Sequence, residues 1–187
     1  MSETIYIDGG YPVDKIANVL ANDGIVIMPS DTVYGFLFTQ KVAEKVRMIK
    51  RRDDKPFLFF ISDINQLEEL GVDYKPFVDV LEKNWPGPFT FIFDNHDGTT
   101  SGVRMPEWDV LKELSVKTGK VLYSTSVNFS GQSPMEDVAD MHAAFDGQVD
   151  LFVFDKSFLP GTPSTIVRLS ENDGVKIIRK GGSELKL

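Results

Sequence analysis

Four short segments of this 187-residue chain combine hydroxyl, amide and cationic side chains in patterns that suit the binding of phosphates and carboxylates. They are residues 29–35, 50–53, 124–131 and 161–165. Each adjoins an apolar run that is typical of a strand, or ends a run that is typical of a helix. Catalysis by such groups relies on placement and charge stabilisation. We therefore assign no catalytic nucleophile, general acid or general base.

The first two segments suit ligands of different charge. Ser30 and Thr32, beside Asp31, could hold the ammonium and hydroxyl groups of an amino acid, although the same residue types also form ordinary Asx and Ser turns. Lys50 and Arg52 lie two residues apart at the end of a predicted helix, so both could reach one polyphosphate. The lysine would supply a point charge and the arginine a two-pronged donor.

The third and fourth segments are rich in small polar side chains. Residues 124–131 follow an apolar strand and close with a glycine, which lets a ligand approach the backbone. A plain strand-to-helix turn is the alternative. Residues 161–165 precede another strand, and Arg179 lies farther along. Because all four segments fall near strand ends, we expect them to meet in one ligand crevice.

Composition excludes several common catalytic centres. The chain has no cysteine, which excludes disulfides, thiolate zinc sites, iron–sulfur clusters and cysteine nucleophiles. Its two histidines, His96 and His142, are too few for a multi-histidine metal site, and we expect both at the surface. The phosphate-binding P-loop motif, the dinucleotide-binding glycine motif and the Gly-x-Ser-x-Gly elbow are all missing from the sequence.

The charge is unevenly distributed. Twenty basic and 28 acidic residues give a net charge of −8, which argues against binding nucleic acid through the overall field. Residues 41–55 hold seven basic and three acidic side chains, so they carry +4 while the other 172 residues carry −12. This basic island indicates a local anionic ligand. A solvated helix face with ion pairs, such as Glu44 with Arg47, is the alternative.

Apolar periodicity predicts one α/β domain that covers residues 1–187. Helices are expected at 11–22, 41–50, around 77–84, 108–118 and 135–145, and strands at 25–28, 56–61, 89–93, 102–105, 121–124, 151–154, 165–169 and 175–179. Ser133 is the expected N-cap of helix 135–145, with Pro134 at its first position. The interleaved order, with strands clustered late, predicts a twisted open mixed sheet with flanking helices.

The start of the chain and the length of its apolar runs indicate where in the cell the protein is expected. The start of the chain lacks a basic patch followed by an apolar stretch, which is the pattern of a signal peptide. No apolar run approaches the roughly 20 residues that cross a bilayer. We expect a cytoplasmic protein that does not enter a membrane.

Taken together, the segments resemble the YrdC-like family, the threonylcarbamoyl-AMP synthases. Six motifs occur in order: Pro-Ser-Asp-Thr-Val-Tyr-Gly (29–35), Lys-x-Arg followed by Lys-Pro-Phe (50–57), Trp-Pro-Gly-Pro-Phe-Thr (85–90), Val-Arg-Met-Pro (103–106), Ser-Thr-Ser-Val-Asn-x-Ser-Gly (124–131) and Pro-Ser-Thr-Ile-Val (163–167). With their flanking residues they extend over nearly the whole chain. The resemblance implies a YrdC-like fold with a concave cavity lined by cations.

The resemblance also implies an activity. L-threonine, bicarbonate and ATP, with Mg²⁺ accompanying the triphosphate, would give L-threonylcarbamoyladenylate and pyrophosphate. Transferase proteins that modify tRNA would then use the product to form threonylcarbamoyladenosine. A contact between this chain and tRNA or other RNA is left open.

Site residues follow from the matched motifs. The resemblance implies ATP contacts at Lys50, Arg52, Thr100, Asn128, Ser133 and Arg179, and threonine contacts at Ser30, Thr32, Arg104, Ser126 and Ser164. Among these, Arg104 is expected to clamp the threonine carboxylate. Lys50 and Arg52 would act by positioning and electrostatics.

The chain departs from the family pattern at several positions. Asp53 replaces a proline, Phe60 a histidine and Val127 an alanine, and the loop at 94–101 is shorter. Two alternatives are therefore kept: a YciO-type paralogue with a related, undetermined activity, and a nucleotide- or RNA-binding module. The negative charge outside the basic island argues against broad RNA affinity, because phosphate contacts need many cations.

Overall fold

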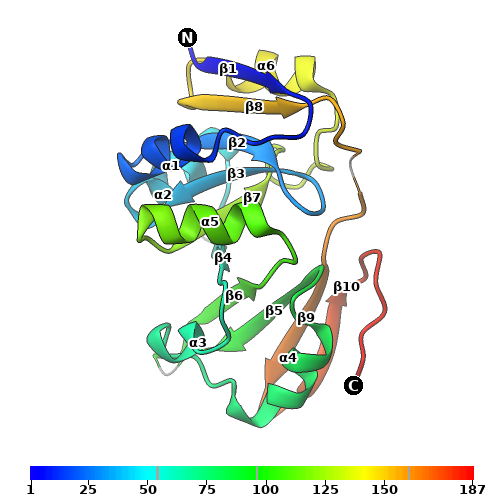
Figure 1. Cartoon of the computed structure of the whole chain (residues 1–187). Helices are drawn as coiled ribbons and strands as arrows, with labels where there is room; N and C mark the ends of the chain where they lie inside the picture. The colour runs from blue at the N-terminus through cyan, green and yellow to red at the C-terminus, as the bar shows by residue number, and fades with distance from the viewer. Residues whose placement is uncertain (54, 96, 160) are drawn as a thin grey trace.

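In a computed structural model that describes residues 1–53, 55–95, 97–159 and 161–187, ten strands form one continuous sheet (Figure 1). Their order across the sheet is β1 (Glu3–Ile7), β8 (Leu151–Asp155), β2 (Val26–Pro29), β3 (Tyr34–Thr39), β7 (Leu122–Ser126), β4 (Leu58–Phe60), β6 (Thr100–Arg104), β5 (Phe89–Asp94), β9 (Thr165–Ser170) and β10 (Gly174–Arg179). Parallel pairs such as β4 with β6 occur together with antiparallel pairs such as β3 with β7. The predicted mixed sheet is confirmed.

Helices flank this sheet in the described part of the chain. They are α1 (Val13–Ala21), η1 (Gln40–Val42), α2 (Ala43–Lys50), α3 (Gln66–Glu69), η2 (Lys75–Phe77), α4 (Val78–Asn84), α5 (Asp109–Thr118) and α6 (Val138–Phe145). The helices expected from periodicity are all present. Among the strands and α-helices, β1, β3 and α3 were not predicted, and neither was the short 3-10 helix η2. All six residues of β3 are buried, so the strand lacks the alternation that marks a strand exposed on one face.

The helix predicted from residue 135 begins three residues later, and Ser133 is not its N-cap. The cap is Asp137, whose carboxylate accepts hydrogen bonds from the backbone N–H groups two and three residues later, at 2.8 and 3.0 Å. These bonds satisfy two of the donors that a helix leaves unpaired at its start. The backbone N–H of Met135 instead donates to the carbonyl of Val127 at 2.7 Å, which holds the preceding segment against the end of β7.

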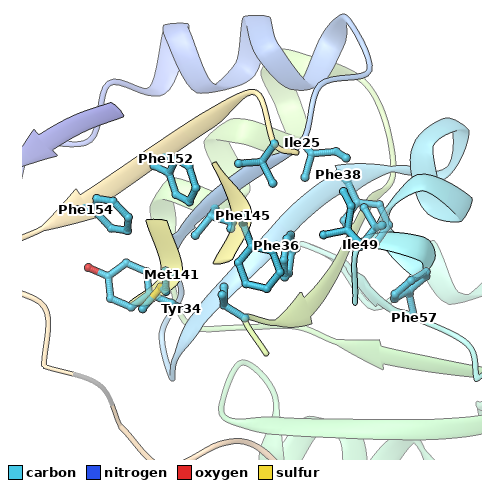
Figure 2. Packing of buried hydrophobic residues seen from close by; sticks show 14 residues of the cluster. Ile25, Tyr34, Phe36, Phe38, Ile49, Phe57, Met141, Phe145, Phe152 and Phe154 are labelled. Atoms are coloured by element: carbon cyan, nitrogen blue, oxygen red, sulfur yellow. The ribbon is translucent and has the colours of Figure 1, made fainter. Parts of the chain in front are cut away.

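One face of the sheet is covered by helices at both ends. The register places six apolar side chains from neighbouring strands on this face: Phe38, Tyr123, Phe59, Val103, Phe91 and Val167. α2 and α6 pack over one end, where the rings of Phe36 and Phe145 lie 5.1 Å apart (Figure 2). α3 and α4 pack over the other end through Leu67 and Leu81.

The opposite face is covered at one end. α1 and α5 pack there on β2, β3, β7 and β8, with Leu20 and Leu114 in the shared core. The same face continues into β4, β6, β5 and β9, whose side chains line a cavity. In Figure 1, α1 and α5 lie beside the upper strands, and β5, β6 and β9 extend below them. The arrangement of helices therefore determines where the sheet remains accessible.

The cap assignment gives a stability prediction. Asp137→Ala removes both bonds at the start of α6 and should lower the free energy of unfolding by about 1 kcal/mol. Ser133→Ala, the matched control, should change it by less than about 0.5 kcal/mol. Urea denaturation followed by circular dichroism measures both values. A larger loss for Ser133→Ala than for Asp137→Ala would contradict the assignment.

Candidate active site

A cavity of about 420 Å³ opens on the accessible part of the sheet face. Residues from all four polar segments line it, so the segments meet in one crevice as expected. The residues assigned by resemblance that line it are Ser30, Thr32, Arg52, Thr100, Arg104, Ser126, Ser164 and Arg179. Three others lie outside the described lining, namely Lys50, Asn128 and Ser133. The ligand that each residue binds stays a prediction.

The lining is positively charged although the protein is acidic. Arg52, Lys55, Arg104 and Arg179 line the cavity, and no acidic side chain is found among the described lining residues. The chain as a whole carries −8. A concave surface with poorly polarisable walls concentrates the field of such cations. The cavity therefore suits a ligand with several negative charges, such as a polyphosphate or a carboxylate.

Arg104, at the end of β6, is fixed by two hydrogen bonds. The residue is 3% exposed; Nη1 donates to Thr32 Oγ1 at 3.0 Å and Nη2 to the carboxylate of Asp31 at 2.6 Å. Burial lowers the pKa of Arg104 and raises that of Asp31, and their ion pair offsets part of both shifts. The buried Nε–H finds no acceptor among the described residues. An unpaired buried donor is costly, so Arg104 has capacity for a further acceptor.

The segment that contains Asp31 forms both a turn and a wall of the cavity. Ser30 Oγ donates to the carbonyl of Val33 at 2.7 Å, so the Ser turn that the sequence left open is present. The backbone N–H of Gly161 donates to the carbonyl of Thr32 at 2.7 Å. A Cβ at position 161 would lie 3.1 Å from that oxygen, so glycine eases this close approach. The connection from β8 to β9 thereby holds the turn.

Lys50 fastens the end of α2 to the turn after β7. Its side chain is almost fully buried, and Nζ donates to the carbonyls of Ser126 and Asn128 at 2.5 and 2.7 Å and to Asn128 Oδ1 at 2.8 Å. Ser126 Oγ also donates to Asn128 Oδ1, at 2.8 Å. Burial and, less strongly, the charge of Arg52 lower the pKa of Lys50 to about 7. The amine of Lys50 thus positions both residues of the Ser-x-Asn pair.

Arg52 is braced just beyond the same helix. Its Nη2 donates to the carbonyl of Pro56 at 2.9 Å, and its guanidinium lies 5.1 Å from the ring centre of Phe57. Burial lowers the pKa of Arg52. Asp53, which stands where the family has proline, forms an exposed ion pair with Lys55 at 2.9 Å. This departure therefore places a carboxylate beside one of the four cations of the lining.

The far wall comes from β5, β9 and β10. Arg179 Nη2 donates to the carbonyl of Ser164 at 2.9 Å, and the hydroxyls of Ser164 and Thr90 lie 2.9 Å apart. Thr90 and Gly102 line the cavity but were not singled out from the sequence. The alternation in β5 carried a signal for Thr90, because the three phenylalanines of that strand face the covered side and the residue between the first two must face the other.

In the described part of the chain, no group of three or more His, Asp or Glu side chains gathers in a way that could hold a metal ion. His142 lies at a partly exposed position on α6, and its ring is 5.0 Å from that of Phe152. His96 lies outside the described residues. None of the described helices has the length and apolar character to cross a membrane.

Comparison with known proteins gives both sequence and fold relatives. The Sua5_yciO_yrdC family model, described as "Telomere recombination", matches residues 18–181. A putative threonylcarbamoyl-AMP synthase of Methanocaldococcus jannaschii is 30% identical over 173 residues, covering 87% of this chain and 82% of the relative. A threonylcarbamoyl-AMP synthase of Bacillus subtilis is 25% identical over 185 residues, covering 91% of this chain and 53% of the relative. The chain therefore spans about half the length of the Bacillus protein.

Two solved structures share the fold. Sua5 of P. abyssi, solved with L-threonine, has a TM-score of 0.84 at 21% identity, and the match covers 97% of this chain and 58% of the Sua5 chain. YciO of E. coli also has a TM-score of 0.84, at 22% identity, and covers 98% of both chains. Because the two scores are equal, backbone similarity does not separate a Sua5-like protein from a YciO-like one.

The buried amine gives a pH prediction. The pKa of Lys50 is about 7 in the folded protein, and that of an unperturbed lysine is about 10.4. Between these values the unfolded chain binds more protons, so the stability contributed by Lys50 is lowest below pH 7 and rises toward pH 10. As the pH rises through this range, the free energy of unfolding of the wild type should increase relative to that of Lys50→Met by up to about 1.4 kcal/mol per pH unit.

Urea denaturation of wild type and Lys50→Met at several pH values measures the difference directly. Lys45→Met, an exposed position on the same helix, is the matched control. A wild-type-to-Lys50→Met difference that stays flat across this range would show that the amine keeps its ordinary protonation in the folded state.

Proposed function

This chain belongs to the Sua5, YciO and YrdC family, and from that premise we propose that it is an L-threonylcarbamoyl-AMP synthase. It would be a nucleotidyltransferase that converts L-threonine, bicarbonate and ATP into threonylcarbamoyladenylate and pyrophosphate. The names of the Methanocaldococcus and Bacillus relatives support this reaction, and the fold shared with a Sua5 solved with L-threonine supports an amino-acid substrate.

The observation that carries the proposal is the charge of the cavity. Four cations and no described carboxylate line it, in a protein with a net charge of −8. ATP brings several negative charges and threonine brings a carboxylate, so together they match this lining. The cavity also has the volume of a typical small-molecule site.

The chemistry needs positioning more than proton transfer by side chains. The threonine amine attacks the carbon of bicarbonate with loss of water, or of carbon dioxide with release of a proton from the amine to solvent, to give a carbamate. A carbamate oxygen then attacks the α-phosphorus of ATP, and pyrophosphate leaves. Arg52, Lys55 and Arg179 would stabilise the charge on the phosphates, while Arg104 would hold the threonine carboxylate with the help of its Nε–H, which has no acceptor among the described residues.

Mg²⁺ would enter with ATP. The described lining has hydroxyl groups but no carboxylate, so it lacks the ligands that usually bind this ion to a protein. The triphosphate would supply the charged oxygens. When bound, the ion would neutralise part of the charge that develops on the leaving pyrophosphate.

The product is a reactive mixed anhydride, so a transferase that modifies tRNA in the cytoplasm would consume it. Direct RNA binding by the basic island is less favoured. The 172 residues outside the island carry −12, and this negative charge opposes the binding of a polyanion.

A YciO-type activity is the second candidate. The match with E. coli YciO covers 98% of both chains, so the shared fold takes in nearly all of the given sequence. Phe60, where the family has histidine, lines the cavity and makes that wall apolar. A related substrate in the same cavity would fit these two observations.

The reaction itself gives the deciding assay. Purified protein supplied with ATP, Mg²⁺, threonine and bicarbonate should release pyrophosphate, and omission of threonine should abolish the release. A coupled pyrophosphatase assay measures the rate. Release that does not depend on threonine would favour the YciO-type alternative, and no release at all would contradict both a synthase role and a related adenylating role.

Nucleotide binding gives a separate prediction. Arg52→Ala should weaken ATP binding by about 1–3 kcal/mol, the range for losing a charge-assisted hydrogen bond. Calorimetric titration with a non-hydrolysable ATP analogue measures the change. Lys45→Ala removes an equal charge from the exposed side of α2 and serves as the control. Equal losses for both variants would mean that Arg52 acts only through the general field.

A further inference from the structure

Gly102 lies on the floor of the cavity without a structural need for glycine. Across the strands it pairs with Leu58 of β4 and Ile92 of β5, and all three residues line the cavity. Its φ lies outside the left-handed region that favours glycine. A Cβ at this position would lie 3.9 Å from Leu58 Cα and Cβ and from Thr90 Cγ2, which is ordinary van der Waals contact.

A glycine in the middle of a strand costs stability relative to alanine. Gly35, by contrast, has a packing reason: a Cβ there would lie 3.2 Å from Ser124 Oγ and 3.3 Å from the carbonyl of Thr125. Because neither backbone conformation nor packing requires Gly102, its effect is on the cavity. It leaves a recess in the floor where a ligand can approach the sheet backbone.

The recess combines apolar walls with a cationic neighbour. Leu58 and Ile92 flank it, and Arg104 lies two residues along the same strand on the same face. Residues spaced in this way are separated by about 6.6 Å along a strand. A small amino acid whose carboxylate is held by Arg104 can therefore extend its side chain over position 102. Thr90, which pairs with Arg104 across the strands, forms the polar end of the recess.

We propose that Gly102 is a specificity-determining residue, whose missing side chain leaves the recess that receives the methyl group of the bound amino acid. This inference rests on the proposed use of threonine. The apolar walls would favour threonine over serine, which lacks the methyl group, and the limited space would exclude longer side chains.

Gly102→Ala is a clean test because the added methyl group meets only ordinary contacts. It should lower kcat/KM for threonine by about 10-fold or more while that for serine falls much less, since one methyl group in an apolar pocket is worth about 10- to 200-fold. The KM for ATP should stay within about twofold. The control is Ser101→Ala, one residue earlier and outside the described lining, which should leave kcat/KM for both threonine and serine unchanged.

The outcomes separate this inference from the proposed function. Threonine-dependent pyrophosphate release by the wild type, with an unchanged threonine-to-serine ratio in Gly102→Ala, would overturn the inference alone. A rise in the KM for ATP without a change for threonine would also overturn it, because the recess would then hold the nucleotide.

Two further measurements cover other results. If the wild type releases no pyrophosphate, calorimetric titration with threonine and serine replaces the rate: loss of the preference in Gly102→Ala supports the recess, and no preference in the wild type overturns it. If Gly102→Ala unfolds, Ile92→Val enlarges the same recess and should raise activity with 3-hydroxynorvaline, which carries an ethyl group where threonine carries the methyl group. Unchanged activity of that variant with 3-hydroxynorvaline would count against the recess.

Discussion

An uneven covering of one sheet is the constraint on which the site depends. Ten strands of the described chain share a single sheet, and helices cover one face at both ends. On the other face, α1 and α5 cover one end. On that face, side chains of the strands beneath α1 and α5 pack into the core, and side chains of the strands beyond these helices line the cavity. Leu37 on β3 lies in the core, while Ile92 of β5, in the same row of the register, lines the cavity.

Two cations join the cavity to the surrounding structure in different ways. Lys50 is buried with its three hydrogen bonds directed to the turn after β7, so it sets the geometry of one wall. Arg104 is equally buried but retains an unpaired donor. The hydrogen bonds of Lys50 stabilise the fold, whereas Arg104 can still donate a hydrogen bond to a ligand. Types and spacing in the sequence do not distinguish these roles, because Lys50 appears there only as a basic side chain at a helix end and Arg104 only as one in a strand.

The predictions from sequence succeeded where a local signal was strong. Helices with apolar residues on one side, and the polar segments between them, are set by short-range patterns. β3 was missed because both of its faces are buried, which removes the alternating pattern. Ser133 had the residue type of a cap, with proline next to it, but a backbone bond from Met135 to Val127 overrides that signal. Gly102 was missed because its place in the cavity depends on the register between strands, which one sequence does not contain.

The fixed position of Arg104 has an energetic consequence for recognition. A flexible arginine at a surface gives up rotamer freedom worth about 2 kcal/mol when it closes on a carboxylate. Here Asp31 and Thr32 already restrict the guanidinium. That entropy is lost when the chain folds, together with the hydration of the side chain. An incoming anion therefore meets a rigid, dry donor, and a larger share of the attraction between them appears as affinity.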